Sequence, residues 1–92
     1  MSRLTEEVER ELEKAYKMFP KWPTDPLHAL AILGEEYGEL VQAVLQEVYE
    51  PHKNTPGAIR KEAMQTAAMA LCFLQQLDTY EYKQCKQANK HE

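Results

Sequence analysis

A set of glutamate and glutamine side chains is spaced so that it could bind a divalent cation. Glu35, Glu36 and Glu39 occur in one segment of helical character, and Glu62 and Gln65 follow in another. No Lys or Arg stands three or four positions from Glu36 or Glu39, although such neighbours would neutralise them on a helix. Magnesium prefers oxygen ligands and keeps water and substrate phosphates bound. The pattern therefore predicts a magnesium site and metal-assisted hydrolysis of a phosphoanhydride.

The same residues have a second interpretation that involves no chemistry. Glutamates on a helix are most often exposed to solvent, and an acidic stripe can also form hydrogen bonds across the interface of an oligomer. Periodicity alone does not decide between a metal site and these structural roles.

Three helices should position these residues, over residues 2–18, 26–49 and from 56 or 57 to about 87. Asp25-Pro26 is typical of an N-cap followed by proline at the first helical position. Prolines in the segment 19–26 end the first helix, and the segment 50–57 separates the second from the third. We expect an all-α fold, a helical bundle of three main helices per chain.

Apolar residues recur at steps of three and four along each helix, which predicts the faces that form the core. In the first helix this stripe contains Leu4, Val8, Leu12, Ala15, Tyr16 and Phe19, and the glutamates at 6, 7, 9, 11 and 13 should form a solvated face. In the second helix the predicted core stripe contains Leu30, Leu33, Tyr37, Leu40, Val41, Val44 and Val48. In the third it contains Ile59, Ala63, Ala67, Ala70, Leu71, Leu74 and Leu77.

A second stripe on each of the later helices carries the candidate ligands. Ala29, Ile32, Glu36, Glu39, Ala43 and Glu47 share one face of the second helix, and Glu62, Thr66, Met69, Phe73 and Tyr80 share one face of the third, with Gln65 at its edge. We expect these two stripes to face each other across the interior of the bundle.

The composition indicates one soluble domain over residues 1–92, with the motifs in 26–77 and a frayed tail over 84–92. The chain has 92 residues, of which 43% are hydrophobic and 28% charged. So short a chain buries a limited core, and we expect a homodimer or homotetramer to complete it. A net charge of −4 without a basic block argues against nucleic acid as a partner. Without a signal peptide or a membrane-spanning run, the chain is expected to be cytoplasmic.

Cys72 and Cys85 are not expected to form a disulfide. In one continuous helix their Cα atoms would lie about 20 Å apart. The histidines are scattered and lack the paired spacing of zinc ligands, so no zinc site is predicted.

Other side chains could contact a phosphorylated substrate. Arg60 and Lys61, next to Glu62, could bind phosphate, although a surface cation is the commoner role. Trp22 and Phe73 could enclose a nucleotide base, but packing against the core is the default role of both. Trp22 lies in the proline-rich connector and could simply anchor it.

The two motifs together resemble the MazG-like all-α nucleotide pyrophosphohydrolases. The segments are Leu33-Gly34-Glu35-Glu36-Tyr37-Gly38-Glu39-Leu40 and Lys61-Glu62-Ala63-Met64-Gln65-Thr66-Ala67-Ala68-Met69. Members of this superfamily carry E-E-x-x-E on one helix and E-x-x-D on the next. They form dimeric or tetrameric helical bundles and, with magnesium, cleave nucleoside triphosphates to the monophosphate and pyrophosphate.

The resemblance implies roles for individual residues. Glu36, Glu39 and Glu62 would be magnesium ligands, and Glu35 a further ligand or the group that orients the attacking water, so that Glu35 and Glu36 are the expected catalytic residues. Gln65 stands where the family has Asp. Its carbonyl oxygen can still bind magnesium but brings no negative charge, so the site should bind the ion more weakly.

Two non-catalytic functions are the alternatives. The chain could be a degenerate member of the family that serves as an oligomeric interaction module, or a regulatory module that binds nucleotide without hydrolysing it. Magnesium-dependent release of pyrophosphate would distinguish the enzyme from both.

Overall fold

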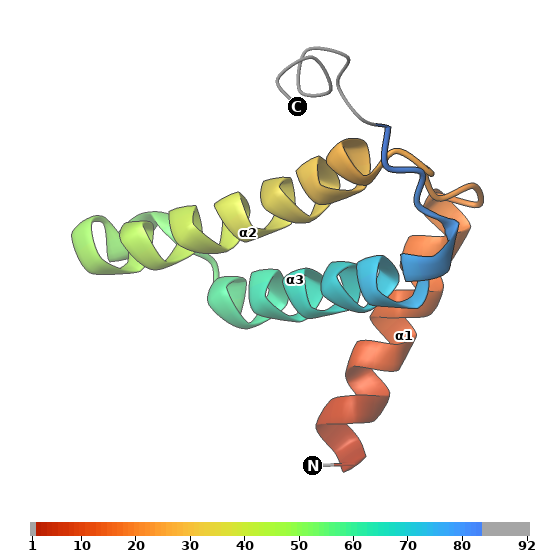
Figure 1. Cartoon of the computed structure of the whole chain (residues 1–92). Coiled ribbons are helices and arrows are strands. Elements are labelled where there is room, and N and C mark those ends of the chain that lie inside the picture. The colour runs from red at the N-terminus through yellow and green to blue at the C-terminus, as the bar shows by residue number, and fades with distance from the viewer. Residues whose placement is uncertain (1, 84–92) are drawn as a thin grey trace, which may run out of the picture.

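The computed structural model describes residues 2–83, and these form three main α-helices and no strand. The helices are α1 (Ser2–Met18), α2 (Pro26–Tyr49) and α3 (Ala58–Gln75) (Figure 1). Two short 3₁₀ turns, η1 (Pro51–Lys53) and η2 (Leu77–Thr79), follow α2 and α3. The all-α prediction is confirmed, and α1 and α2 have the predicted bounds.

The helix ends follow from local sequence. The side chain of Asp25 accepts a hydrogen bond of 3.0 Å from the backbone N–H of Leu27, and Pro26 occupies the first turn, as predicted. Gly57 precedes α3 with φ of 80°, a left-handed conformation that glycine adopts without steric cost. The side chain of Asn54 donates to the Ala43 carbonyl at 3.0 Å, which fastens the loop between α2 and α3 to α2.

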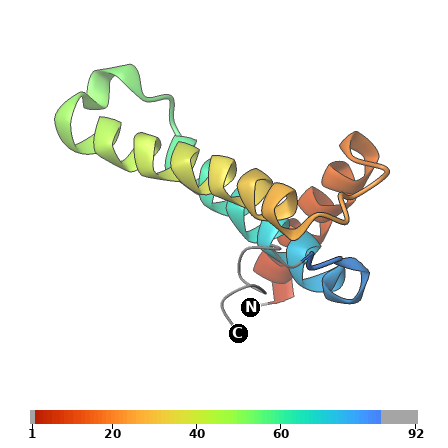
Figure 2. The ribbon, with the colours of Figure 1, turned by 45° about the horizontal axis from the view of Figure 1, so that its top comes forward.

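Helix α3 holds the fold together. It runs antiparallel beside α2, and α1 crosses the C-terminal half of α3 at a steep angle (Figures 1 and 2). Helix α3 packs against both neighbours, whereas α1 and α2 make no close backbone approach to each other. The backbones of α1 and α2 therefore lie on separate sides of α3.

The hydrophobic core lies where α1 crosses α3. Ala15, Met69 and Cys72 are its buried members. Half-buried side chains pack around them, namely Leu12, Tyr16, Phe19, Trp22, Ile32 and Leu33. The core is small, and the far halves of α2 and α3 extend beyond it (Figure 2).

The predicted third helix was too long, because α3 ends at Gln75 instead of continuing to residue 87. After η2 the chain turns back toward the connector, where the Trp22 indole N–H donates to the Tyr80 hydroxyl at 2.8 Å. The Tyr80 hydroxyl donates to the Phe73 carbonyl at 3.1 Å, and the Glu81 N–H donates to the Thr24 carbonyl at 2.9 Å. These bonds join the segment after α3 to the connector and to the end of α3.

The part of the predicted third helix over residues 84–87, the predicted tail over 84–92 and Cys85 lie outside the described residues. The predicted separation of Cys72 and Cys85 required one helix through both residues, and α3 ends at Gln75. Cys72 itself is a buried free thiol.

The stripes predicted to form the core on α2 and α3 are in large part exposed in this chain, whereas the second stripes face each other between the two helices, as predicted. On α2, Ala29 and Ala43 from the second stripe are buried against α3, while Tyr37 and Val48 from the predicted core stripe are 59% and 65% exposed. On α3, Met69 from the second stripe is buried and Leu74 from the predicted core stripe is 58% exposed. The small residues of the second stripe allow the two helices to approach closely, and the larger apolar side chains point outward.

The exposed residues form one surface, called here the apolar face, on the side of α2 and α3 away from α1. It comprises Leu30, Tyr37, Val41, Val44, Val48, Ala63, Ala70 and Leu74, all exposed. With this face uncovered the chain measures 54 × 31 × 23 Å and has a radius of gyration of 16.7 Å. A compact chain of this length would have a radius of about 12 Å. The chain is thus extended and leaves much apolar surface in contact with water.

Among residues 2–83, no helix is both long enough and apolar enough to span a membrane. The cytoplasmic location stays a prediction.

Candidate metal centre

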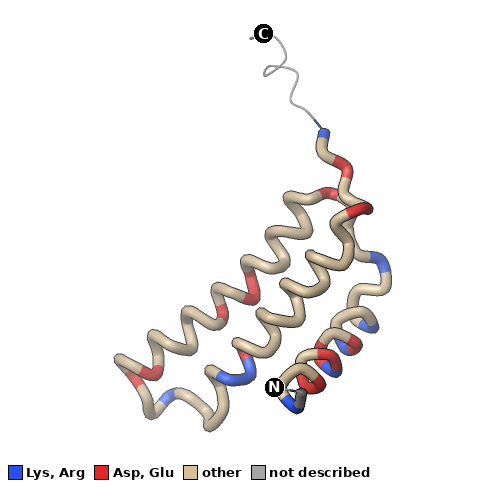
Figure 3. The backbone as a smooth tube through the Cα atoms, turned by 60° about the horizontal axis from the view of Figure 1, so that its bottom comes forward, with Lys and Arg blue, Asp and Glu red and all other residues tan. Residues whose placement is uncertain are grey.

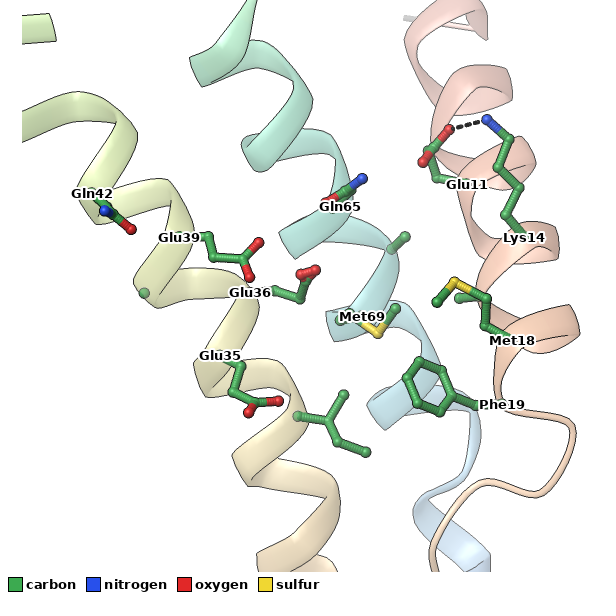
Figure 4. Close-up of a pocket in the computed structure, with 14 residues that line it drawn as sticks. Glu11, Lys14, Met18, Phe19, Glu35, Glu36, Glu39, Gln42, Gln65 and Met69 are labelled. Atoms are coloured by element: carbon green, nitrogen blue, oxygen red, sulfur yellow. Dashed lines mark hydrogen bonds and ion pairs between the residues drawn. The ribbon is translucent and has the colours of Figure 1, made fainter. Parts of the chain in front are cut away.

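Three carboxylates from two helices meet between α2 and α3. Glu36 and Glu39 extend from the middle of α2 toward α3, and Glu62 comes from the first half of α3. One oxygen from each of the three lies within 4.8 Å of the others. Figure 4 shows Glu36 and Glu39 directed at α3. We call Glu36, Glu39 and Glu62 the carboxylate cluster. The helical phase predicted from sequence does bring these residues together.

The cluster lacks internal compensation for its charge. Oε2 of Glu36 and Oε1 of Glu62 are both buried and accept no hydrogen bond from the described residues. A buried acceptor without a donor is costly, and an ionised one more so. A cation bound between the three side chains would satisfy both oxygens and remove the repulsion.

Burial and mutual repulsion raise the pKa of two members. For Glu36 the largest cause of the raised pKa is desolvation, followed by the charges of Glu39, Glu62 and Glu35. For Glu62 desolvation again raises the pKa most, and Glu39 adds both its charge and a hydrogen bond. Lys61 acts in the opposite direction on both groups but does not cancel the rise.

Thr66 fixes the spacing of the two helices at the cluster. Its hydroxyl donates to the carbonyl of Glu62 at 2.8 Å, one turn earlier on α3. The same oxygen lies 3.2 Å from the carbonyl of Glu36 on α2. The buried Ala29 and Ala43 lie to either side of Glu36 on α2 and permit this close approach. The one proton of this hydroxyl can be donated to either carbonyl, so Thr66 lies in hydrogen-bonding reach of both main chains at the cluster.

A groove of about 550 Å³ adjoins the cluster and separates α1 from α2. Its α2 wall carries Glu35, Glu36, Glu39 and Gln42, and Gln65 and Met69 of α3 form its floor (Figure 4). Its α1 wall carries Glu11, Lys14, Ala15, Met18 and Phe19. One side of the groove is thus acidic and the other largely apolar, a combination suited to a ligand with a cation-bound anionic part and an apolar part.

The predicted amide ligand and water-orienting group both lie at this groove. Gln65 lines it from α3, and the exposed Glu35 lines it one position before Glu36 on α2. Both residues are therefore within the same pocket as two members of the cluster, on the side that faces α1 (Figure 4).

The predicted phosphate contacts lie beside the cluster in a second pocket, of about 450 Å³, which we call the basic pocket. Lys61 lines it from the start of α3. Arg60 also lines it and forms an ion pair of 2.7 Å with Glu7 of α1. Figure 3 shows a basic stretch at the beginning of α3 and mixed charges along α1.

The two aromatic residues predicted to hold a base lie elsewhere. Trp22 packs edge-on against Phe19, with ring centroids 6.4 Å apart, and joins the connector to Tyr80. Phe73 packs against Tyr80 at a centroid distance of 4.9 Å and lines a separate pocket with Leu27 and Leu30. Neither of them lines the groove, and their contacts are those of structural anchors.

The sequence patterns did not indicate several residues that line the site. Glu11 was assigned to a solvated face, but its half-buried carboxylate pairs with Lys14 at 2.9 Å, and both line the groove and the basic pocket. Glu7 is likewise half-buried in its pair with Arg60, whereas Glu6, Glu9 and Glu13 are exposed as predicted. Phe19 takes the place at the groove that sequence reasoning gave to Trp22. The pairing of α1 with α3 is a tertiary contact, and no local pattern signals it.

The arrangement is chemically suited to hard cations. The carboxylate oxygens of Glu36, Glu39 and Glu62, next to an open groove, are of the kind that magnesium uses together with phosphorylated ligands. Comparison with protein-family models, with curated proteins and with solved structures gave no match.

Proposed function

We propose that this chain is a magnesium-dependent nucleoside triphosphate pyrophosphohydrolase of the MazG-like type. It would hydrolyse a nucleoside triphosphate or deoxynucleoside triphosphate to the monophosphate and pyrophosphate. The observation that supports this most is the carboxylate cluster. One oxygen from each of its three residues lies within 4.8 Å of the others, and Oε2 of Glu36 and Oε1 of Glu62 are buried without a donor. Such a cluster is stabilised by a cation, and the adjoining groove has room for a nucleotide.

Each residue at the site has a place in the proposed reaction. Glu36, Glu39 and Glu62 would hold magnesium, with Gln65 as a neutral ligand. When bound, magnesium screens the charge of the phosphates and acidifies a coordinated water. Glu35 would orient the water whose oxygen attacks the α-phosphorus and accept its proton. The bond from the α-phosphorus to the bridging oxygen breaks, and pyrophosphate leaves with that oxygen.

We propose a second copy of the chain as the partner that covers the apolar face. Two antiparallel helices with an uncovered apolar side form half of a four-helix bundle, and a two-fold axis can bring identical faces together. Between Pro26 and Tyr49, the side of α2 that belongs to the apolar face carries no charged residue, so like charges would not meet across such an interface. A homodimer would be the smallest assembly, and two dimers could form a homotetramer.

One observation favours a non-catalytic alternative. Gln65 supplies an amide where the resembled family has a carboxylate, so the site has one negative charge fewer with which to hold magnesium. A degenerate module would bind nucleotide, or only its own copy, without turnover.

The test is release of pyrophosphate from a panel of canonical and modified nucleoside triphosphates, with and without magnesium. The parent chain is compared with Glu36→Gln and with Glu9→Gln, an exposed glutamate of α1 that serves as the control. We expect release that requires both magnesium and Glu36 and is unaffected in the control. Magnesium-independent release, or equal rates in both variants, would contradict the proposal. Saturable nucleotide binding without release would favour the module.

A further inference from the structure

The basic pocket concentrates positive charge in a chain that is acidic as a whole. Arg10, Lys14, Arg60 and Lys61 line it together with only two acids, Glu7 and Glu11. The local balance is therefore four cations against two carboxylates, whereas the whole chain has a net charge of −4. The cations come from two helices, α1 and α3, that are distant in sequence. A surface organised in this way favours an anion with several oxygens.

Part of this charge is free to bind a ligand. Arg60 and Lys14 are engaged with Glu7 and Glu11. Arg10 and Lys61 form no ion pair within residues 2–83, and both are exposed. The two existing pairs hold Arg60 and Lys14 in place beside the two unpaired cations.

The basic pocket adjoins the groove, and one of its residues lies near the carboxylate cluster. Glu11, Lys14 and Gln65 line both the groove and the basic pocket. The positive charge of Lys61 is close enough to Glu36 and Glu62 to offset part of the rise in the pKa of both groups. An elongated ligand with one phosphate at the cluster could therefore extend into the groove on one side and into the basic pocket on the other.

We propose that the basic pocket binds the diphosphate leaving group, so that the nucleoside part of the substrate lies in the groove. This assignment of the anion rests on the proposed function. It fixes the direction of the substrate, because the proposed reaction places the α-phosphate at the carboxylate cluster and the basic pocket would hold the two phosphates beyond it. The apolar α1 wall of the groove, formed by Met18 and Phe19, then faces the nucleoside. Arg10 and Lys61 are the contacts available to the two terminal phosphates.

The experiment measures binding of inorganic pyrophosphate by calorimetry, without magnesium. The background is the full chain with Glu36→Gln and Glu39→Gln, which removes the repulsion of the cluster and any turnover. Into this background Arg10→Gln is introduced, with Arg3→Gln as the matched control on the same helix, because Arg3 is exposed and lines neither pocket. Circular dichroism checks that each variant is helical.

We expect Arg10→Gln to weaken pyrophosphate binding about tenfold, the effect of losing one charge-assisted hydrogen bond, and Arg3→Gln to leave it unchanged. Lys61→Gln should act like Arg10→Gln, with the exposed Lys17→Gln as its control. A nucleoside monophosphate should not displace pyrophosphate, since the two would occupy different pockets. Equal affinities in Arg10→Gln and Arg3→Gln, no binding in the background, or competition by the monophosphate would each overturn the assignment.

The outcome is separable from the proposed function because this background has no turnover. If pyrophosphate binding depends on Arg10 but the parent chain hydrolyses no nucleotide, the proposed anion site is supported and the proposed enzymatic activity is contradicted. Hydrolysis by the parent without Arg10-dependent binding would retain the enzyme and remove the leaving-group site.

Discussion

The carboxylate cluster is destabilising for the protein without a cation. Glu36, Glu39 and Glu62 repel one another, and two of their oxygens are buried without donors. Charged residues that lower the stability of a fold in this way usually serve a function, such as binding a ligand that neutralises their charge. The cost at Glu36 and Glu62 is therefore the main reason to infer a bound metal.

Replacing a glutamate of the carboxylate cluster by glutamine should raise the stability of the metal-free chain while lowering magnesium binding and turnover. We expect Glu36→Gln and Glu39→Gln each to lower magnesium affinity and turnover by more than about 100-fold, since even partners of metal ligands contribute 10- to 100-fold. Without magnesium both variants should be more stable than the parent, by about 0.2 to 0.5 kcal/mol for each like-charge pair removed. Urea unfolding with and without magnesium measures both effects. Variants that unfold instead would show that the glutamates are structural.

The raised pKa values predict how stability depends on pH. Because the pKa of Glu36 and Glu62 is raised in the folded chain above 4.5, the folded state binds more protons than the unfolded state above that pH. The contribution of Glu36 and Glu62 to the free energy of unfolding is therefore fully present below pH 4.5. It is lost as the pH rises through the raised pKa values that these groups have in the folded chain. We expect the metal-free parent to lose unfolding free energy over this range relative to Glu36→Gln, and saturating magnesium to abolish the difference at neutral pH. Identical pH profiles for parent and variant would refute this.

At the scale of the helices, Thr66 is the link that holds α2 and α3 at the cluster. Thr66→Val removes the hydroxyl that donates to Glu62 and lies near the carbonyl of Glu36, at nearly constant shape. We expect a loss of about 1 kcal/mol of unfolding free energy and weaker magnesium binding. Thr66→Ser keeps the hydroxyl and should retain the magnesium affinity. Equal affinities in the Val and Ser variants would show that the hydroxyl does not position the cluster.

Element bounds were predictable where local signals are strong. Proline and the Asp25 cap set the limits of α1 and α2. The end of α3 was not predictable in the same way, because Leu77 and Tyr80 continue a helical spacing. After Gln75 the chain instead makes tertiary hydrogen bonds, those of Tyr80 with Trp22 and Phe73. The weak helix formers Asp78 and Thr79 were the available signal.

The helical phase could be read from the sequence, but the partner of each face could not. Periodicity correctly places Glu36 and Glu39 on one face with Ala29 and Ala43, and so predicts which ligands converge. It does not say whether a stripe packs within the chain or against another molecule. The most apolar stripe was assigned to the core of the chain, yet Tyr37 and Val44 are exposed. Hydrophobicity identifies a buried surface without identifying what buries it.

At the scale of the whole molecule, the extended shape predicts self-association. We expect the parent chain to sediment as a dimer or tetramer. Val44→Glu, on the apolar face, should raise the dissociation constant of the oligomer at least about tenfold, because the new charge would be buried in the interface. Ala31→Glu is the control, since Ala31 is exposed on the same helix roughly 140° around its axis. A monomeric parent, or equal shifts in both variants, would contradict the proposed interface.

We infer that Glu36, Glu39 and Glu62 bind one cation together, and a crystal structure that locates a bound metal ion would test this. Crystals of the parent chain grown with manganese in place of magnesium would give an anomalous difference map in which the ion is unmistakable. We predict a peak within bonding distance of a carboxylate oxygen from each of the three residues, facing the groove. A map with no peak there, or with the ion bound only at other acidic residues, would contradict the account.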